Sequence, residues 1–146
     1  MIALVCAPDG ERRAIHRTFL RHDGTKAQTA PVKASLGPIW GGAIRLSPSV
    51  SDAPLIVAEG IETAAAAGHL MGFPAWAAIA AGNLGIGMIL PPSVRRVIIA
   101  ADPDEPGRKA ARAAWTRWRA EGREVRIATP DGDGDFADVL ARETEN

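Results

Sequence analysis

The strongest constraint on the fold comes from two short apolar runs that each end in acidic residues. Residues 55–58 read Leu-Ile-Val-Ala and are followed by Glu59, and a second apolar run at residues 94–101 is followed by Asp102 and Asp104. Segments with helical spacing of apolar residues lie between and after these runs, so that predicted strands alternate with predicted helices. The clearest helix is expected at residues 106–121, and its core-facing side is expected to carry Ala111, Ala114, Trp115 and Trp118. This alternation predicts an α/β fold in which a mainly parallel sheet is flanked by helices.

The first third of the chain follows a different pattern. Apolar runs at residues 2–7 and 14–20 flank a Pro-Asp-Gly turn, which predicts an antiparallel β-hairpin, and one further strand is expected at residues 42–46. We therefore expect two parts, a small β-rich antiparallel appendage at residues 1–50 and an α/β domain at residues 51–146.

Composition narrows the class of protein. Hydrophobic residues make up 47% of the 146 residues and charged residues 23%, which is typical of a globular chain. The apolar stretches are interrupted by Gly, Pro or Asn before they reach the roughly 18 to 20 residues needed to cross a bilayer, so we expect a cytoplasmic protein with no membrane partner. The single cysteine, Cys6, excludes an internal disulfide and a zinc ribbon within this sequence.

Charge is balanced over the whole chain but unevenly distributed along it. Residues 1–50 carry seven Lys or Arg against three acids, residues 51–105 two against six, and residues 106–146 eight against eight. An acidic middle between more basic segments suits a cation-dependent site with phosphate-binding margins. A solvated surface without function would show the same distribution of charge. Only the sequence motifs can distinguish such a surface from a cation-dependent site.

The acids that follow the two apolar runs stand where functional groups gather in an α/β fold. Loops at the carboxyl ends of parallel strands converge on one crevice. Because side chains alternate along a strand, Asp102 and Asp104 are expected to point the same way, and Glu59 to face them if the two strands are neighbours. Three carboxylates at one point repel one another unless a cation neutralises them, and hard oxygen ligands suit Mg²⁺ or Mn²⁺. The sequence therefore predicts metal-assisted chemistry on phosphates.

Three motifs occur in the order found in a known family. They are Glu59-Gly60-Ile61-Glu62-Thr63-Ala64, then residues 101–111 with their Asp-Pro-Asp sequence, then Asp135-Phe136-Ala137-Asp138-Val139-Leu140. Together they resemble the motifs of Toprim domains, most closely those of phage and plasmid DNA primases and primase-helicases, over residues 53–142. Segments within residues 17–46 also resemble the region that precedes the Toprim part in primase-like proteins.

The resemblance implies a Rossmann-like Toprim fold and a set of catalytic roles. Glu59 is expected to act as a metal ligand or as a general acid/base, while Asp102 and Asp104 hold the divalent ion, Mg²⁺ or Mn²⁺. Asp135 is expected as a further metal ligand. Asp138 matches the same motif, but a carboxylate in the first turn of a helix is also favoured by the helix dipole, so its role stays open.

One departure from the family pattern concerns the first motif. Primase Toprim domains often carry an aspartate four residues after the glutamate, whereas this chain has Thr63 at that place and an acid, Glu62, one residue earlier. The departure leaves open whether the first motif supplies a second acid to the site.

Five further residues are candidates for binding substrate. Arg108 and Lys109 begin the helix that follows the aspartate pair, where a helix N-terminus favours phosphate, although a solvated helix face explains them as well. Gly60 follows the glutamate directly. Lys26 and Lys33 lie in the region before the Toprim part and are possible template or nucleotide contacts, without a local motif to support them.

The function that the resemblance implies is nucleotidyl transfer in DNA replication, in which nucleoside triphosphates are joined on a single-stranded DNA template. A zinc-ribbon module, a helicase module or both are expected as partners, in cis or in trans. A Toprim nuclease, with water as the nucleophile, and a non-catalytic nucleic-acid-binding module are the alternatives. Topoisomerase action requires a tyrosine that forms the covalent DNA link, and the chain contains none.

Overall fold

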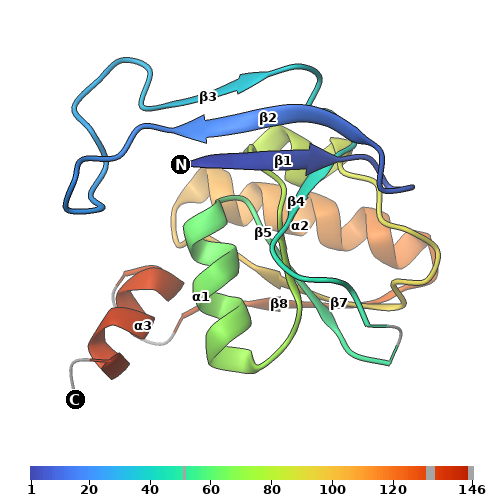
Figure 1. Cartoon of the computed structure of the whole chain (residues 1–146). Coiled ribbons are helices and arrows are strands. Elements are labelled where there is room, and N and C mark those ends of the chain that lie inside the picture. The colour runs from blue at the N-terminus through green and yellow to red at the C-terminus, as the bar shows by residue number, and fades with distance from the viewer. Residues whose placement is uncertain (51, 131–133, 145–146) are drawn as a thin grey trace.

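The structure, a computed structural model, describes residues 1–50, 52–130 and 134–144. Ser51, the first residue of the expected second part, lies outside the described residues. In chain order the elements are β1 (Ile2–Cys6), β2 (Arg12–Thr18), β3 (Lys33–Leu36), β4 (Ala43–Arg45), β5 (Leu55–Ala58), α1 (Ile61–Met71), β6 (Ala75–Ala77), the π-helical turn η1 (Asn83–Gly87), β7 (Arg96–Ala100), α2 (Glu105–Ala120), β8 (Glu124–Ala128) and α3 (Phe136–Thr144). The strands form one 8-stranded sheet in the order β3-β2-β1-β4-β6-β5-β7-β8 (Figure 1). In these ranges every helix is too short or too polar to traverse a lipid bilayer.

The parallel half of the sheet consists of β6, β5, β7 and β8. Every residue of β5 and β6 is buried, which explains why these strands read as continuous apolar runs rather than as alternating ones. β5 and β7 are direct neighbours, and the pairing of Ala58 with Ala100 makes both strands end at the same edge. The predicted α/β fold with helix-flanked parallel strands is confirmed.

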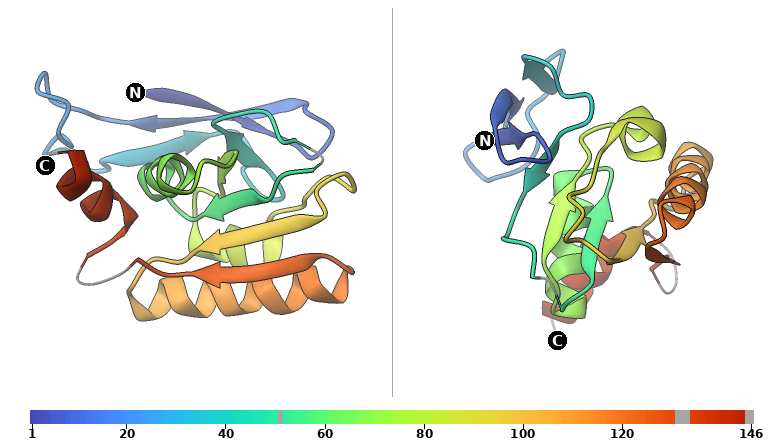
Figure 2. Two further views of the ribbon diagram at one scale, coloured as in Figure 1. Left: turned by 90° about the horizontal axis from the view of Figure 1, so that it is seen from below. Right: turned by 90° about the vertical axis from the view of Figure 1, so that its right-hand side faces the viewer.

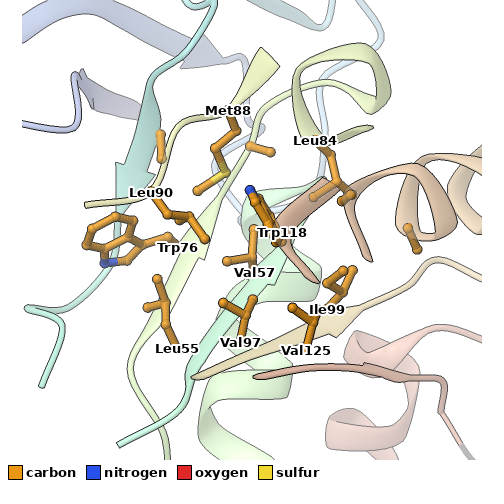
Figure 3. Close-up of a cluster of buried hydrophobic side chains, with 14 of the residues drawn as sticks. Leu55, Val57, Trp76, Leu84, Met88, Leu90, Val97, Ile99, Trp118 and Val125 are labelled. Carbon is orange, nitrogen blue, oxygen red and sulfur yellow. The ribbon is translucent and has the colours of Figure 1, made fainter. Parts of the chain in front are cut away.

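Helices cover both faces of this parallel half. α1 and α3 pack on one face, and α2 and η1 pack on the other (Figures 1 and 2). On the α2 face, Trp118 is fully buried in one cluster with Val57, Val97 and Ile99 (Figure 3). The helical spacing of Trp118 with the alanines of α2 predicted this core position, and the prediction is confirmed.

The N-terminal strands extend the same sheet. β1 and β2 form the predicted antiparallel hairpin, and β4 pairs with β1 on one side and with β6 on the other, antiparallel in both cases. β3, which the sequence did not predict, pairs with β2 and forms one edge of the sheet. Lys33, Ser35 and Leu36 of this 4-residue strand are exposed, so its sequence carries no buried periodicity that would have revealed it.

Candidate active site

A polar cavity of about 490 Å³ opens at the carboxyl edge of β5 and β7. It is lined by the start of α1, by the loop after β7, by the segment that leads into α3 and by the N-terminal part of the chain. The charged residues that face it are Glu59, Glu62, Asp102, Asp104, Asp135, Asp138, Lys26 and Lys33. Ligand pockets are usually lined mainly by apolar side chains, so a lining with this many charges indicates a charged ligand.

Glu59 directly follows β5 and is fixed through its backbone. Its carbonyl oxygen accepts a hydrogen bond of 2.7 Å from the N–H of Ile79, which also lines the cavity. Ile79 has a φ of 78°, a left-handed conformation that is strained for a β-branched residue, and strain of this kind collects at functional sites. The pairing of Ala58 with Ala100 places Glu59 beside the segment that begins with Asp102.

Asp102 and Asp104 follow β7, and each is held by a hydrogen bond to one oxygen. Thr63, in the first turn of α1, donates its hydroxyl to Asp102 Oδ1 at 2.9 Å. Asp104 caps α2 and accepts the N–H of Gly107 at Oδ1, over 2.7 Å. A Cβ at Gly107 would lie 2.8 Å from Asp104 Oδ1 and 2.9 Å from Asp102 Cβ. The glycine is therefore required for the close approach of the helix to both aspartates.

Asp135 and Asp138 bond to each other's backbone at the start of α3. The N–H of Asp138 donates to Asp135 Oδ1 at 3.0 Å, and the N–H of Asp135 donates to Asp138 Oδ2 at 2.9 Å. This reciprocal pattern is that of a capping box, which satisfies backbone donors that the helix leaves free. A structural role for Asp138 is thus present, while Asp135 is bonded through Oδ1 and lies beside the other acids.

The acids of the cavity act on one another electrostatically. Burial, followed by the charges of Asp102 and Asp104, raises the pKa of Glu59. Burial also raises the pKa of Asp102, against the hydrogen bond from Thr63 and with the help of the charges of Asp135 and Asp104. A divalent cation would relieve this repulsion, and carboxylate oxygens are the ligands that Mg²⁺ and Mn²⁺ prefer. The donor set therefore fits such an ion.

The carboxylates share the cavity without being drawn together around one point. Within residues 1–50, 52–130 and 134–144, no three His, Cys, Asp or Glu side chains are arranged closely enough to enclose an ion as they stand. Among the ion pairs of these same residues, none joins Glu59, Asp102 or Asp104 to a basic side chain. Mutual repulsion favours the spread arrangement, since the described part of the chain leaves these charges unpaired.

Glu62 holds two lysines from the N-terminal part of the chain at the cavity. Its Oε1 lies 3.3 Å from Lys26 Nζ, and its Oε2 lies 3.1 Å from Lys33 Nζ. Burial alone would raise the pKa of Glu62, but hydrogen bonds from its own backbone and from Lys33, with the charges of both lysines, lower it. The charge of Lys33 reaches further, because it also opposes the rise in the pKa of Glu59 and Asp102.

The other predicted substrate-binding residues lie in different places. Gly60 is the N-cap of α1 and lines the cavity. The guanidinium of Arg108 donates to the carbonyl of Pro103 and lies 3.5 Å from Glu105 Oε2, outside the cavity lining. Lys109 lines a separate, mostly apolar cavity between η1 and α2. Of these three residues, the structure brings only Gly60 together with the acids.

Two polar residues in the cavity had little support from the sequence: Thr63 was not expected to line the site, and Lys33 was named only as a possible template or nucleotide contact. Thr63 stood out only as the place where an aspartate is missing, although a residue four positions after Glu59 lies one helical turn further along the same crevice. Lys33 had no local motif, and its position depends on β3, which pairs it with Thr18. Its only sequence signal is the excess of basic residues in the N-terminal part of the chain.

Comparison with known proteins agrees with the motifs. A family model of the Toprim domain matches residues 54–146, and a model described as a domain of unknown function (DUF7146) matches residues 1–46. No curated protein has a sequence that matches the chain.

Two solved structures share its fold. The primase fragment of the bacteriophage T7 primase-helicase protein is 16% identical, with a TM-score of 0.64 over 97% of this chain and 58% of that chain. The DnaG catalytic core is 20% identical, with a TM-score of 0.59 over 97% of this chain and 48% of that chain. The chain thus spans about half the length of these two structures, and at such identities the likeness establishes a common fold.

The Toprim match covers more than half of the chain. It includes the acids after β5 and β7 and the last acidic motif before α3. Fold, motif order and family model agree, and the chain belongs to the Toprim domain family.

Proposed function

We propose that the chain performs Mg²⁺-dependent nucleotidyl transfer on nucleic acid, as the catalytic module of a DNA primase-like protein. The observation that carries the proposal is the pairing of two kinds of charge in one cavity. Carboxylates that follow β5 and β7 form one side, and Lys26 and Lys33 from the N-terminal part form the other. This arrangement suits a substrate that brings both a divalent cation and phosphate groups, as a nucleoside triphosphate does.

In this proposal the acids divide two tasks. Asp102, Asp104 and Asp135 each accept a hydrogen bond at Oδ1. They would hold the cation, Mg²⁺ or Mn²⁺, through their Oδ2 oxygens. The bound ion supplies charge stabilisation for the phosphoryl group that is transferred. Glu59 joins the ligand set or takes up a proton, and its burial, which raises its pKa, favours the second role.

The reaction that follows is an attack by a hydroxyl oxygen of the initiating nucleotide or primer on the α-phosphorus of the triphosphate. A P–O bond forms, the bond to pyrophosphate breaks, and the hydroxyl proton passes to the Glu59 carboxylate. Lys26 and Lys33 contact the phosphate oxygens, because an ammonium group has three donors and the ion pair with Glu62 does not use them all. The N-terminus of α1, which begins after Gly60, adds a field that favours anions.

The template that we propose is single-stranded DNA, with Arg108 and Lys109 at the exposed start of α2 as contacts to its phosphates. The sequence has one cysteine, so a zinc ribbon that selects a start site has to come from another module. We therefore expect a zinc-ribbon or helicase partner, in cis or in trans. The common fold with a fragment of a primase-helicase protein supports this expectation.

The proposal is tested by incubating the protein with single-stranded DNA, ribonucleotides and Mg²⁺ or Mn²⁺. We expect short oligonucleotides as products, and Asp102→Ala should stop their formation. Asp52→Ala is the matched control, because Asp52 is an exposed acid near the opposite end of β5. Product formation should be weak and poorly selective for sequence, since no zinc ribbon is present to choose a start site.

Two other results would contradict the proposal. Metal-dependent cutting of the DNA that is lost in Asp102→Ala would identify a nuclease, in which water is the nucleophile. Binding of metal and DNA without either activity would identify a non-catalytic nucleic-acid-binding module. Formation of oligonucleotides that persists in Asp102→Ala would place the chemistry outside this cavity.

A further inference from the structure

We propose that Thr63 is a positioning residue that orients Asp102 as a one-oxygen ligand and thereby sets the affinity of the site for Mg²⁺. The inference rests on the proposed function, because it takes Asp102 as a metal ligand. It assigns a task to the residue that occupies the place of the missing second acid in the first motif.

The first observation is the contact itself. Thr63 is 5% exposed, and its Oγ1 donates to Asp102 Oδ1 over 2.9 Å. The two residues are 39 positions apart and belong to different elements, so the bond joins the start of α1 to the loop after β7. A threonine on a helix has few side-chain rotamers, and in the one observed here the buried hydroxyl is directed at Asp102.

The second observation is that the three aspartates proposed as ligands share this form of restraint, whereas Asp138, the fourth aspartate of the cavity, accepts the N–H of Asp135 at Oδ2. Asp102 accepts from Thr63, Asp104 accepts from the N–H of Gly107, and Asp135 accepts from the N–H of Asp138, in each case at Oδ1. Each carboxylate then has its Oδ2 as the oxygen left for a cation. Two of the three donors are backbone N–H groups, which a side-chain substitution does not remove. The third donor, the hydroxyl of Thr63, can be removed by a substitution.

Carboxylates that are held so that they bind through one oxygen favour Mg²⁺ over Ca²⁺. Mg²⁺ demands near-octahedral geometry with short bonds and is usually bound through one or two carboxylates, whereas Ca²⁺ accepts carboxylates through both oxygens in a looser shell. Without the hydroxyl of Thr63, Asp102 is free to rotate and to offer both oxygens. Loss of the restraint should therefore weaken Mg²⁺ binding more than Ca²⁺ binding. Partners that orient ligating groups typically contribute about 10- to 100-fold to metal affinity.

The experiment compares the unchanged protein with Thr63→Val, which keeps the shape but lacks the hydroxyl, and with Thr63→Ser, which keeps the hydroxyl. Melting temperature is followed while MgCl₂ alone or CaCl₂ alone is added, and the concentration for half of the shift is read for each ion. Thr63→Val should need about 10-fold or more Mg²⁺, with a smaller change for Ca²⁺. Thr63→Ser should stay close to the unchanged protein.

A double-mutant comparison separates positioning from a general packing role. In an Asp102→Asn background, where the proposed ligand is gone, Thr63→Val should have no further effect on Mg²⁺ binding. A Mg²⁺ response in Thr63→Val that equals that of the unchanged protein would overturn the inference, as would an equal loss for Mg²⁺ and Ca²⁺ that Thr63→Ser shares. If Thr63→Val does not fold, the same comparison is made between Thr63→Ala and Thr63→Ser.

Failure of the proposed metal site looks different. In that case the unchanged protein itself shows no shift with Mg²⁺, and both the site and the role of Thr63 are rejected. A shift that is present in the unchanged protein and equal in Thr63→Val rejects only the role of Thr63.

Discussion

The two sides of the cavity are built in different ways. The acidic side follows buried strands: Ala58 and Ala100, the last residues of β5 and β7, are both 0% exposed. The basic side comes from an edge strand and a loop, and the side chains of Lys26 and Lys33 are 55% and 38% exposed. The sheet core fixes where the acids lie, whereas ion pairs near the surface fix where the lysines lie.

The difference has an energetic meaning. Displacing a strand end disturbs a packed core, and changes in a well-packed core typically cost about 1 to 3 kcal/mol. An exposed ion pair contributes about 0 to 1 kcal/mol, so the lysines can follow a ligand at little cost. We therefore expect changes on the acidic side to act on the reaction as a whole, and changes on the basic side to alter substrate affinity in a graded way.

The largest expected effect is that of Asp102→Asn. Loss of a metal ligand removes several kcal/mol of charge stabilisation, so the turnover rate should fall by at least about 100-fold, and the melting temperature should rise only at much higher concentrations of Mg²⁺, with Asp104 and Asp135 as the remaining ligands. Lys33→Ala should keep the Mg²⁺ response, because Lys33 belongs to the other side of the cavity. Equal Mg²⁺ responses in Asp102→Asn and in the unchanged protein would show that the ion binds elsewhere.

A smaller effect is expected on the basic side. Lys33→Ala and Lys26→Ala should each raise the KM for the nucleoside triphosphate by up to about 10-fold, with a smaller change in kcat, because each removes a contact of about 1 kcal/mol to the phosphates. The effect should shrink as salt is added. Arg95→Ala is the matched control, since Arg95 is an exposed basic residue just before the other end of β7. A rise in KM with Lys109→Ala but not with Lys33→Ala would place the triphosphate at the start of α2 instead.

The difference between the acidic and the basic side of the cavity explains which site residues could be predicted from the sequence. The acids after β5 and β7 were predictable, because a buried parallel strand is a continuous apolar run and its end is visible in the sequence. Thr63 and Lys33 were not predictable from local patterns. Thr63 meets Asp102 across 39 positions, and Lys33 meets Glu62 across 29.

The fold shows a similar contrast. The helices around the parallel half were predicted to within a few residues, since their apolar faces repeat at helical spacing: α2 was expected at residues 106–121 and runs from Glu105 to Ala120. β3 was missed because backbone pairing with β2, rather than a buried face, makes it a strand. The continuity of the N-terminal strands with the main sheet depends on the pairing of β4 with β6, which no local sequence signal encodes.

The acidic and the basic side of the cavity should also differ in how they change the stability of the protein with pH, and Glu59 determines the effect on the acidic side. Burial and the charges of Asp102 and Asp104 raise the pKa of Glu59 above its ordinary value of 4.5. Its contribution to stability is therefore fully present below that value and is lost as the pH rises through the folded-state pKa. Glu59→Gln should raise the melting temperature of the metal-free protein at pH 7 by about 1 to 4 °C and change it little at acidic pH.

The control for Glu59→Gln is the protein with Mg²⁺. There the order should reverse, because the ion stabilises only the form that binds it, and the variant has lost one carboxylate. A metal-free Glu59→Gln variant that is less stable than the unchanged protein at pH 7 would show that the charge of Glu59 is compensated in the folded state. Thermal unfolding at pH 4 and pH 7, with and without Mg²⁺, decides between these results.

The smallest effect is expected from His16, which lies near Lys33 of the basic side. Its contribution to stability should be lost as the pH falls, whereas that of Glu59 is lost as the pH rises. His16 is 6% exposed, and its Nδ1 lies 2.8 Å from the Ser35 hydroxyl of β3. Burial, and then the charge of Lys33, lower its pKa below the ordinary 6.5, with the charge of Glu62 acting against them. The unfolded chain therefore takes up a proton on acidification before the folded one does. The contribution of neutral His16 to stability is present above about pH 6.5 and is lost as the pH falls through the folded-state pKa.

His16→Gln should remove this acid-induced loss while keeping a polar group opposite Ser35. Between about pH 7.5 and pH 5.5, its melting temperature should fall by about 1 to 2 °C less than that of the unchanged protein. His22→Gln, at an exposed position, is the control and should follow the unchanged protein. Because Lys33 contributes to the low pKa of His16, Lys33→Ala should also weaken the acid-induced loss. If Lys33→Ala leaves the acid-induced loss of stability unchanged, burial alone keeps His16 neutral, and the charge of Lys33 does not influence the protonation of His16.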